Sequence, residues 1–245
     1  MNIVISSEMR VGSRWLHYLL KDLYNMRVSP EIGKHRFYDK EFDVQSVVNS
    51  YFNENRIVKF HGLLAEEIFN GIGNDFKLIC IVRNPRDRLV SLGLHHKYEK
   101  GYGNYKGISD EDAIKKVMNS SEFKTGNHII HRTMIPEFNS PSEDIPYFWT
   151  SYEWMIEDNF GEIFKINKYL GMEHEVADEP IINAVIKHSF ENRAGRKAGD
   201  ENRNDVWRRK GIIGDWINWF DGEMFDATKS DWDIYWNLIE SSKNT

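Results

Sequence analysis

A polar loop near the start of the chain has the residue types of an anion-binding site. An apolar run at residues 3–5 leads to Arg10, Gly12, Ser13 and Arg14, after which apolar residues recur with the spacing of a helix. This order predicts a strand, a loop and a helix, with Ser13 as the helix N-cap. The free N–H groups at the start of that helix, together with two guanidinium groups, suit a phosphate-like group.

Lys59 and His61 form a second polar pair, close to the end of an apolar, β-branched run that begins at Arg56. A spacing of two places both residues on the same side of a strand. In open parallel sheets, ligands bind at the carboxyl ends of the strands, which is where this pair falls. A lone histidine at such a place is often structural, but the lysine beside it favours a functional interpretation.

A third group of polar residues follows the run at residues 78–82, which is uniformly apolar and predicts a strand covered on both faces. Arg83 stands at the end of this strand, Pro85 suits the start of a helix, and Ser91 lies one to two helical turns further on. If the helix turns back over the strand end, Arg83 and Ser91 reach the same ligand. Cys80 is the only cysteine, and we expect it to be a buried strand thiol.

A basic stretch stands out because the whole chain has a formal net charge of −6. Its basic residues are Arg193, Arg196, Lys197, Arg203, Arg208, Arg209 and Lys210. The stretch is polar and contains glycine, so we expect a flexible loop. The acidic balance of the chain argues against general binding to nucleic acid or to an anionic membrane, and any anion site must therefore be local.

These groups need a scaffold, and length and composition favour one α/β domain over residues 1–245. The chain has 40% hydrophobic residues and 8 Trp, enough for a large core, and no Pro/Gly/Ser-rich linker divides it. Apolar patterns predict a strand at residues 147–150, helices at residues 44–52, 110–118, 159–170 and from 178, and a last helix around Trp232. No run approaches about 18 apolar residues and none precedes the first strand, so we expect a cytoplasmic protein without a membrane span.

Two segments resemble specific motifs of the sulfotransferases that use 3′-phosphoadenosine 5′-phosphosulfate (PAPS). Residues 209–216 are similar to the family's RKGxxGDW signature, and residues 83–91 resemble its RNPxDxxxS motif, in the same order along the chain. The resemblance implies a P-loop-like α/β fold with a central, mostly parallel sheet flanked by helices. It also implies transfer of a sulfuryl group to a hydroxyl or amine of an acceptor.

Weaker matches extend this resemblance over most of the chain. The opening loop looks like the PKSGTTW element, with Arg10 at its lysine position, and residues 59–61 are similar to the K-T-H triplet. Residues 152–153 resemble the Y-E-D element, and residues 189–190 resemble the S-F pair. A guanidinium at position 10 keeps the positive charge of a lysine but cannot donate a proton, so its part shifts towards binding.

The resemblance, checked against the chemistry of the donor, implies a set of nucleotide-binding residues. They are Arg10, Gly12, Ser13, Arg14 and Trp15 at the 5′-phosphosulfate, Arg83, Ser91, Arg209, Lys210 and Gly211 at the 3′-phosphate, and Tyr152, Ser189, Phe190, Trp207 and Arg208 elsewhere on PAPS or its product PAP. Trp15, Phe190 and Trp207 could enclose the adenine by stacking.

Catalysis is expected to depend on His61, Lys59 and Arg10. An imidazole that titrates near neutral pH can take the proton of an acceptor hydroxyl, so His61 is the predicted general base. Lys59 and Arg10 would stabilise the charge that develops on the leaving nucleotide. Because a sulfuryl group carries one negative charge fewer than a terminal phosphoryl group, we expect no metal requirement.

Two other functions remain open at this point: a kinase of similar architecture and a non-catalytic nucleotide-binding protein. The GxxxxGK(S/T) pattern of a kinase P-loop is absent, and no acidic residue is evidently placed to hold Mg²⁺. His95, His96, Tyr98, the loop at residues 101–107, which is mobile by composition, and the irregular segment at residues 119–146 are expected to form the acceptor pocket. Their residue types fit a small molecule, a lipid or a glycan equally well.

The oligomeric state is also open. The family's KxxxTVxxxE dimer segment should follow Trp216, and residues 217–222 do not match it.

Overall fold

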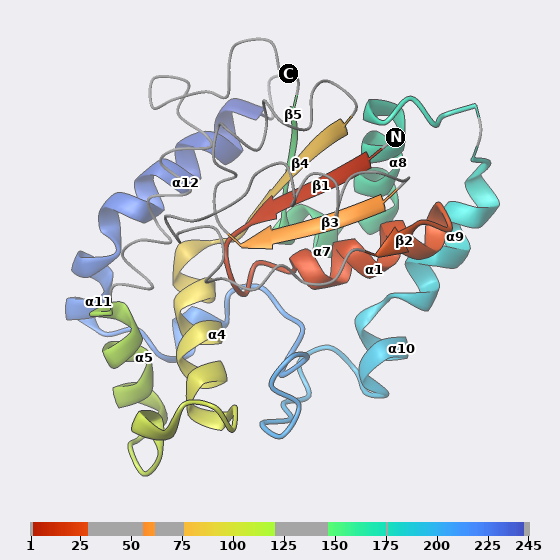
Figure 1. The fold of residues 1–245 in the computed structure, drawn as a ribbon. Helices are drawn as coiled ribbons and strands as arrows, with labels where there is room; N and C mark the ends of the chain where they lie inside the picture. Colours follow the sequence, from red (N-terminus) through yellow and green to blue (C-terminus); the bar gives the residue numbers. More distant parts are fainter. Residues whose placement is uncertain (1, 29–55, 62–75, 121–146, 175, 243–245) are drawn as a thin grey trace, which may run out of the picture.

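A parallel β-sheet with the strand order β2-β3-β1-β4-β5 forms the centre of the described chain (Figure 1). The computed structural model describes residues 2–28, 56–61, 76–120, 147–174 and 176–242. The strands are β1 (Asn2–Ser7), β2 (Arg27–Val28), β3 (Arg56–His61), β4 (Phe76–Val82) and β5 (Tyr147–Ser151), and all neighbouring pairs are parallel. The predicted α/β fold with a mostly parallel sheet is confirmed.

One face of the sheet packs against α1 (Ser13–Leu23), α8 (Asn159–Tyr169) and α9 (Asp178–Lys187). Alternation along β1 directs Ile3 and Ile5 to this face, where both are fully buried. Other members of this core are Leu16, Leu19, Leu20, Ile57, Ile79, Ile81, Ile163, Ile166 and Ile181. Helix α1 contributes positions that are three and four residues apart, as an amphipathic helix must.

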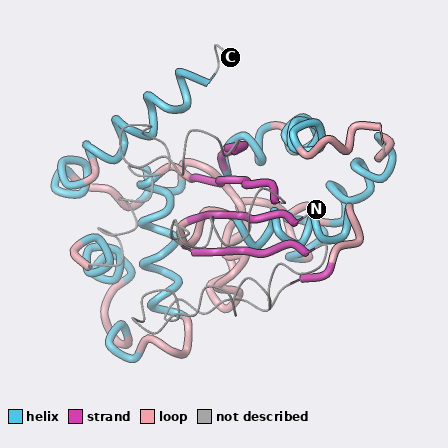
Figure 2. Tube along the Cα trace, turned by 45° about the horizontal axis from the view of Figure 1, so that its top comes forward, coloured by secondary structure: helices cyan, strands magenta, loops and turns pink. Residues whose placement is uncertain are grey.

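A second core surrounds α4 (Pro85–Tyr98), which is buried from Pro85 to His96. Around it lie α5 (Asp110–Met118), η2 (Asp215–Asn218), α11 (Gly222–Ala227) and α12 (Lys229–Ser242). Figure 2 shows the parallel strands between these helices and those of the first core. The first residue of α4 is Pro85, as predicted, because proline fits a helix start. Polar residues on so enclosed a helix must find partners or line a cavity.

The remaining described elements are η1 (Gly103–Tyr105), α7 (Tyr152–Glu157) and α10 (Phe190–Ala194). The predicted helices at residues 110–118, 159–170 and from 178, the strand at residues 147–150 and the last helix around Trp232 are present. The expectations for residues 44–52 and for nearly all of 119–146 lie outside the described residues.

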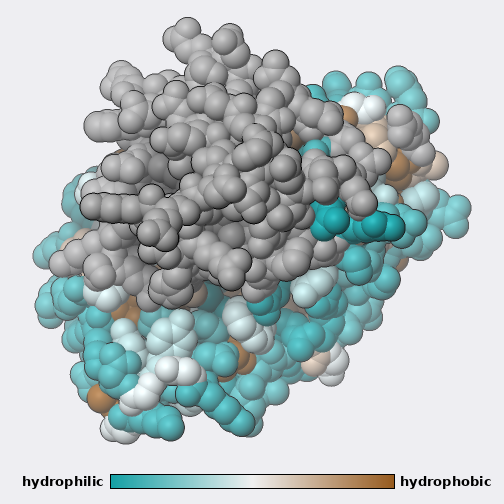
Figure 3. Space-filling view, viewed as in Figure 1, coloured by the Kyte–Doolittle hydropathy of each residue, from teal (hydrophilic) through white to brown (hydrophobic). Residues whose placement is uncertain are grey.

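The face seen in Figure 3 is mainly hydrophilic wherever residues are described, with hydrophobic side chains scattered over it. Within the described ranges, no helix combines the length and the apolar character that crossing a bilayer requires.

Candidate functional site

A cavity of about 630 Å³ lies where β1, β3 and β4 end. Among the predicted site residues, its lining contains Arg10, Gly12, Ser13, Arg14, Trp15, Lys59, Arg83, Ser91, Tyr152, Phe190, Trp207, Arg208, Arg209, Lys210 and Gly211. Parallel strands bring their carboxyl ends to one edge of the sheet, so segments far apart in the sequence meet there.

The turn between β1 and α1 depends on Gly12. This glycine has φ 88°, in the left-handed region, and a Cβ atom on it would lie 2.7 Å from Cδ2 of Tyr152. Gly12 is the N-cap of α1 and its carbonyl accepts hydrogen bonds from the N–H groups of Trp15 and Leu16. The prediction that Ser13 is the N-cap was therefore wrong. Only glycine combines this backbone conformation with so close an aromatic ring, and Ser13 becomes the first helical residue.

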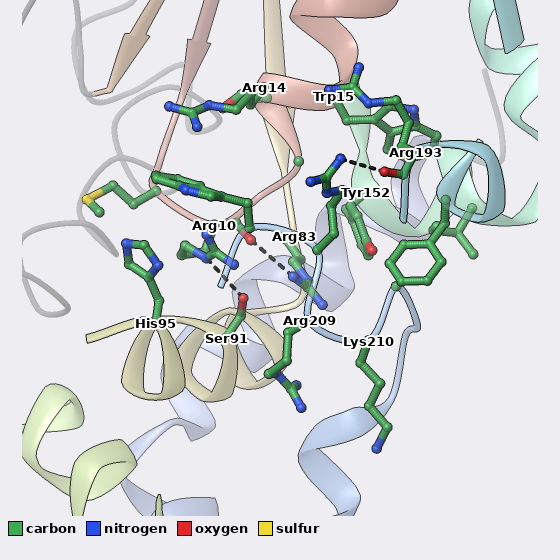
Figure 4. Close-up of a pocket in the computed structure, with 18 of the residues that line it drawn as sticks. Arg10, Arg14, Trp15, Arg83, Ser91, His95, Tyr152, Arg193, Arg209 and Lys210 are labelled. Carbon is green, nitrogen blue, oxygen red and sulfur yellow. Dashed lines mark hydrogen bonds between the residues drawn. The ribbon is translucent and has the colours of Figure 1, made fainter. Parts of the chain in front are cut away.

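Arg10 and Arg83 are held at this turn by neutral oxygen atoms. Arg83 donates from Nη1 to the carbonyl oxygen of Arg10 at 3.1 Å and from Nη2 to that of Ile212 at 3.3 Å. Arg10 donates from Nη2 to the carbonyl oxygen of Val206 at 2.7 Å and from Nε to Oγ of Ser91 at 3.2 Å. Figure 4 shows Arg10, Arg83 and Ser91 close together. These partners orient both guanidinium groups without neutralising them.

Burial, together with nearby positive charge, changes the ionisation of Arg10. Burial, reinforced by the nearby cations Arg83 and Arg209, lowers the pKa of Arg10 to about 9. A bound anion would relieve this repulsion, so the cavity is electrostatically prepared for one.

Two buried donors beside these residues also fit a polar ligand. Nε of Arg83 and the indole nitrogen of Trp15 are buried and have no hydrogen-bond partner among the described residues. The guanidinium of Arg83 lies over the ring of Tyr152, 4.2 Å from its centroid, and the rings of Trp15 and Tyr152 meet edge to face. Buried polar groups normally find partners, so a ligand is a natural source of them.

The segment at residues 209–216 is tied to α4 by Asp87. The carboxylate of Asp87 accepts from the N–H groups of Gly214 at 2.6 Å and Trp216 at 3.0 Å. Asp87 is only 1% exposed, so the link between the two motif segments lies inside the protein. This contact gives the spacing of both motifs a physical reason, since it brings them to the same cavity.

Arg209 and Lys210 line the cavity, but their charged ends lie on Asp215. Lys210 Nζ is 2.6 Å from Oδ1 of Asp215, and Arg209 binds the other oxygen of Asp215 and also Glu201. In Figure 4 both side chains extend away from Arg10 and Arg83. The residues predicted to bind the 3′-phosphate therefore all line the cavity. The charged ends of Arg209 and Lys210, however, are paired with acidic side chains.

The predicted aromatic residues occupy different places. Phe190 packs on Gly211, where φ is 68° and a Cβ atom would lie 2.3 Å from the ring. Trp207 is 49% exposed and contacts the guanidinium of Arg14 at 3.9 Å and the ring of His95 at 4.8 Å. Trp207 therefore contacts an arginine and a histidine, whereas Phe190 packs against the backbone turn at Gly211.

The predicted catalytic pair comes from β3. Lys59 is buried and lines the cavity. His61 is the last residue of β3 and pairs in register with Ser7, but its side chain lies outside the described part. Ser189 does not line the cavity; it is the N-cap of α10, and its hydroxyl accepts from the N–H of Asn192. A serine that precedes a short helix by one position has this purely local explanation.

The lining includes further residues that the sequence analysis did not place at the donor. These are Met9, Tyr18, Glu99, Ile156, His188, Arg193 and Ile212, together with His95 and Tyr102 from the expected acceptor region. Helical periodicity could have found Tyr18, because it follows Trp15 by three positions and shares its side of α1. His188 and Arg193 carry no such signal. The 101–107 loop contains η1, and Tyr102 stacks on His96 with centroids 3.9 Å apart.

Comparison with known proteins identifies the class. A model of the sulfotransferase domain matches residues 2–233, so the chain belongs to the sulfotransferase family. It is an enzyme of this class, as predicted. Mouse sulfotransferase 1 family member D1 is 25% identical over 253 residues, covering 94% of this chain and 82% of the mouse protein. The rat protein of the same name is 25% identical over 256 residues, covering 94% of this chain and 82% of the rat protein.

Solved structures show the same fold. Mouse sulfotransferase SULT7A1, complexed with PAP, superposes with a TM-score of 0.69 at 20% identity, covering 94% of this chain and 82% of that one. Retinol dehydratase, in complex with androsterone and inactive cofactor PAP, gives a TM-score of 0.63 at 19% identity, covering 97% and 80%. At these identities the likeness supports the fold, and the P-loop-like architecture is confirmed.

Among the described residues, no group of three or more His, Cys, Asp or Glu side chains could hold a metal ion. The expectation that the reaction needs no metal stays a prediction.

Proposed function

We propose that this enzyme transfers the sulfuryl group of PAPS to a hydroxyl or amine of a small-molecule, lipid or glycan acceptor. The observation that carries the proposal is the pair Arg10 and Arg83, oriented by carbonyl and hydroxyl oxygens beside the N-terminus of α1. Guanidinium groups and helix N–H groups bind phosphates through charge-assisted hydrogen bonds. A nucleotide with a phosphate at each end of its ribose needs two such cationic places.

The donor contacts we assign follow from this arrangement. The 5′ end of the nucleotide lies at the turn from Arg10 to Trp15, and the 3′-phosphate lies at Arg83, Ser91 and the backbone near Gly211. The unpartnered Nε of Arg83 and indole N–H of Trp15 are donors that such a ligand would satisfy. We also propose that residues 1–245 form one domain.

The transfer step is an in-line displacement at sulfur. The acceptor oxygen forms a bond to sulfur while the bond between sulfur and the bridging oxygen of the 5′-phosphate breaks. The acceptor proton goes to His61, a role that typically contributes about 10²–10⁴-fold. Lys59 and Arg10 stabilise the negative charge that the nucleotide carries away.

Ligand-induced thermal stabilisation tests the donor assignment. We expect PAP and PAPS to raise the Tm of the purified chain, and Mg-ATP to leave it unchanged. Stabilisation by Mg-ATP alone would indicate the kinase alternative.

A panel of hydroxylated and amino acceptors supplied with PAPS, and analysed by mass spectrometry, then tests transfer. A product heavier by one sulfuryl group supports the proposal. Tight binding of PAP without any turnover would indicate the non-catalytic alternative.

A further inference from the structure

A line of polar contacts joins three helices at one side of the cavity. Asp22 lies in α1, His188 follows the end of α9, and Arg193 lies in α10. Nε2 of His188 is 2.9 Å from Oδ2 of Asp22, and Nδ1 of His188 is 2.9 Å from Nη1 of Arg193. His188 and Arg193 both line the cavity.

The partners of His188 determine its protonation. A guanidinium can only donate hydrogen bonds, so Nδ1 of His188 must be the acceptor. The proton of the neutral ring is then on Nε2, from which it is donated to Asp22. The two contacts therefore select one tautomer of an uncharged histidine.

Burial favours the same uncharged state. His188 is 4% exposed, and burial lowers the pKa of His188 below its usual value. A hydrogen bond from Lys187 lowers the pKa of Asp22 to about 2, which keeps the carboxylate charged. The charged groups around His188 are thus Asp22, Lys187 and Arg193, with Lys21 at 3.7 Å from Asp22.

Arg193 is held from two further directions. Its backbone carbonyl accepts a hydrogen bond from Nη1 of Arg208 at 2.5 Å. Its guanidinium lies over the ring of Tyr18, 5.1 Å from the centroid. One of the five guanidinium N–H groups of Arg193 donates to His188. No carboxylate within the described residues forms an ion pair with Arg193. The side chain is thus fixed in place, with donors still facing the cavity.

The surroundings of Arg193 differ from those of Arg10 and Arg83, the arginines that we assign to the phosphates. Figure 4 shows Arg193 next to Trp15 on one side of the cavity, and Arg14 and His95 on the other. The guanidinium of Arg193 lies over the ring of Tyr18, and Phe190 belongs to the same short helix as Arg193, so aromatic rings surround this arginine. Flat rings and a fixed donor suit a nucleobase, because a purine stacks on aromatic side chains and carries ring nitrogens that accept hydrogen bonds.

We propose that Arg193 donates a hydrogen bond to the base of the donor nucleotide, and that Asp22 and His188 are positioning residues that hold it there. This inference rests on the proposed function. It adds a contact that selects the base, beyond those that grip the phosphates. When His188 takes up a proton at low pH, Nδ1 no longer accepts, and two positive charges face each other, so Arg193 leaves its place.

Calorimetric titration with two probes tests the contact. The probes are PAP and ribose 3,5-bisphosphate, which has both phosphates and no base. We expect Arg193→Met to weaken PAP binding by about tenfold, as expected for loss of one charged donor, and to leave the base-free probe unchanged. Lys197→Met is the matched control, since Lys197 is exposed and lies outside the lining; it should bind both probes like the wild type.

The two positioning residues are tested through the pH dependence of PAP binding. In the wild type, affinity should fall only as the pH drops below the ordinary titration range of histidine, because burial lowers the pKa of His188. His188→Gln should flatten this dependence, and Asp22→Asn should move it. Both variants should raise KM for PAPS and leave kcat within twofold, whereas a merely structural loss would lower the amount of folded enzyme.

Four results are decisive. Equal losses of both probes in Arg193→Met, or unchanged PAP binding, would overturn the assigned base contact while the proposed function stands. An unchanged pH profile in His188→Gln would overturn the role of the histidine. A wild-type protein that binds neither probe would overturn the proposed function itself.

Discussion

The cavity has two kinds of cation, and they differ in what holds them. Arg10 and Arg83, which follow β1 and β4, donate to backbone carbonyls and a serine hydroxyl. Arg209 and Lys210, in the long segment before η2, are paired with the carboxylate of Asp215. A neutral partner orients a guanidinium and leaves its charge for a ligand, whereas a carboxylate neutralises it.

This difference follows from where the residues lie in the fold. The strand-end residues are fixed by the sheet and by α4, both deep in the core. The segment before η2 is held by its own backbone, through hydrogen bonds between Gly199 and Lys210 and between Asn202 and Arg209, and by Asp87. To bind Arg209 and Lys210, a phosphate must therefore displace the carboxylate of Asp215. Arg10 and Arg83 are already oriented and need no such exchange.

The largest expected effect is on kcat. The residues at the carboxyl ends of the strands include Lys59 and His61, to which we assign the chemical step. We expect His61→Ala to lower kcat by about 10²–10⁴-fold while PAP binding is retained. Single-turnover transfer from PAPS and calorimetry with PAP measure the two effects. Full activity in His61→Ala would refute the assigned general base.

Asp87→Asn should show how much the hydrogen bonds between α4 and the segment around η2 contribute to stability and to PAP binding. The buried carboxylate accepts two backbone N–H groups, and charge-assisted bonds of this kind are each worth about 1.5–3 kcal/mol. We expect a lower free energy of unfolding in urea and weaker PAP binding. An exposed carboxylate, Glu223, offers a matched control as Glu223→Gln. An unchanged free energy of unfolding in Asp87→Asn would contradict the claim that these hydrogen bonds stabilise the protein.

The pH dependence of PAP binding above neutrality sharpens the contrast. Burial and the neighbouring cations lower the pKa of Arg10 to about 9, so we expect Arg10, unlike the always-charged guanidinium expected from the sequence, to begin losing its proton above that pH in the ligand-free protein. The anion binds the protonated form, so affinity should fall as the pH rises through about 9, and binding there should be accompanied by proton uptake. Arg10→Lys should change the position of this fall. A flat profile up to pH 10 would show that Arg10 stays charged without a ligand.

Asp215→Asn should have the smallest effect on PAP binding, and this effect should be a gain in affinity. Burial opposes ionisation, but hydrogen bonds from Lys210 and Arg209 lower the pKa of Asp215, so the pair is charged at neutral pH. Removing the negative charge releases both cations, and we expect PAP to bind a few-fold more tightly. If binding weakens instead, the carboxylate positions the segment and does not compete with the ligand.

The sequence predicted that Arg10, Arg83 and Ser91 come together, and they line one cavity because the segments after parallel strands meet at one edge of the sheet. Gly12 was assigned to the site but not to the helix cap, since the close ring of Tyr152 comes from a distant segment. β2 was missed because two residues are too few to show a period.

Pairings across long separations could not be predicted. Asp22 and His188 are 166 positions apart, and no periodicity relates them. Asp215 belongs to the RKGxxGDW-like run, but its pairing with Lys210 inside an irregular segment follows no helical or strand spacing. Such contacts depend on how the segments pack, which a single sequence does not specify.

The central claim is that Arg83, fixed by carbonyl oxygens at the end of β4, binds the phosphate that distinguishes PAP from AMP. Calorimetric titration of Arg83→Met with both nucleotides tests it most directly, and a second variant, Arg83→Lys, keeps the charge without the planar group. The account predicts that Arg83→Met loses about 100-fold in affinity for PAP, that Arg83→Lys lies between it and the wild type, and that affinity for AMP hardly changes. Equal losses for PAP and AMP, or no loss for PAP, would contradict it.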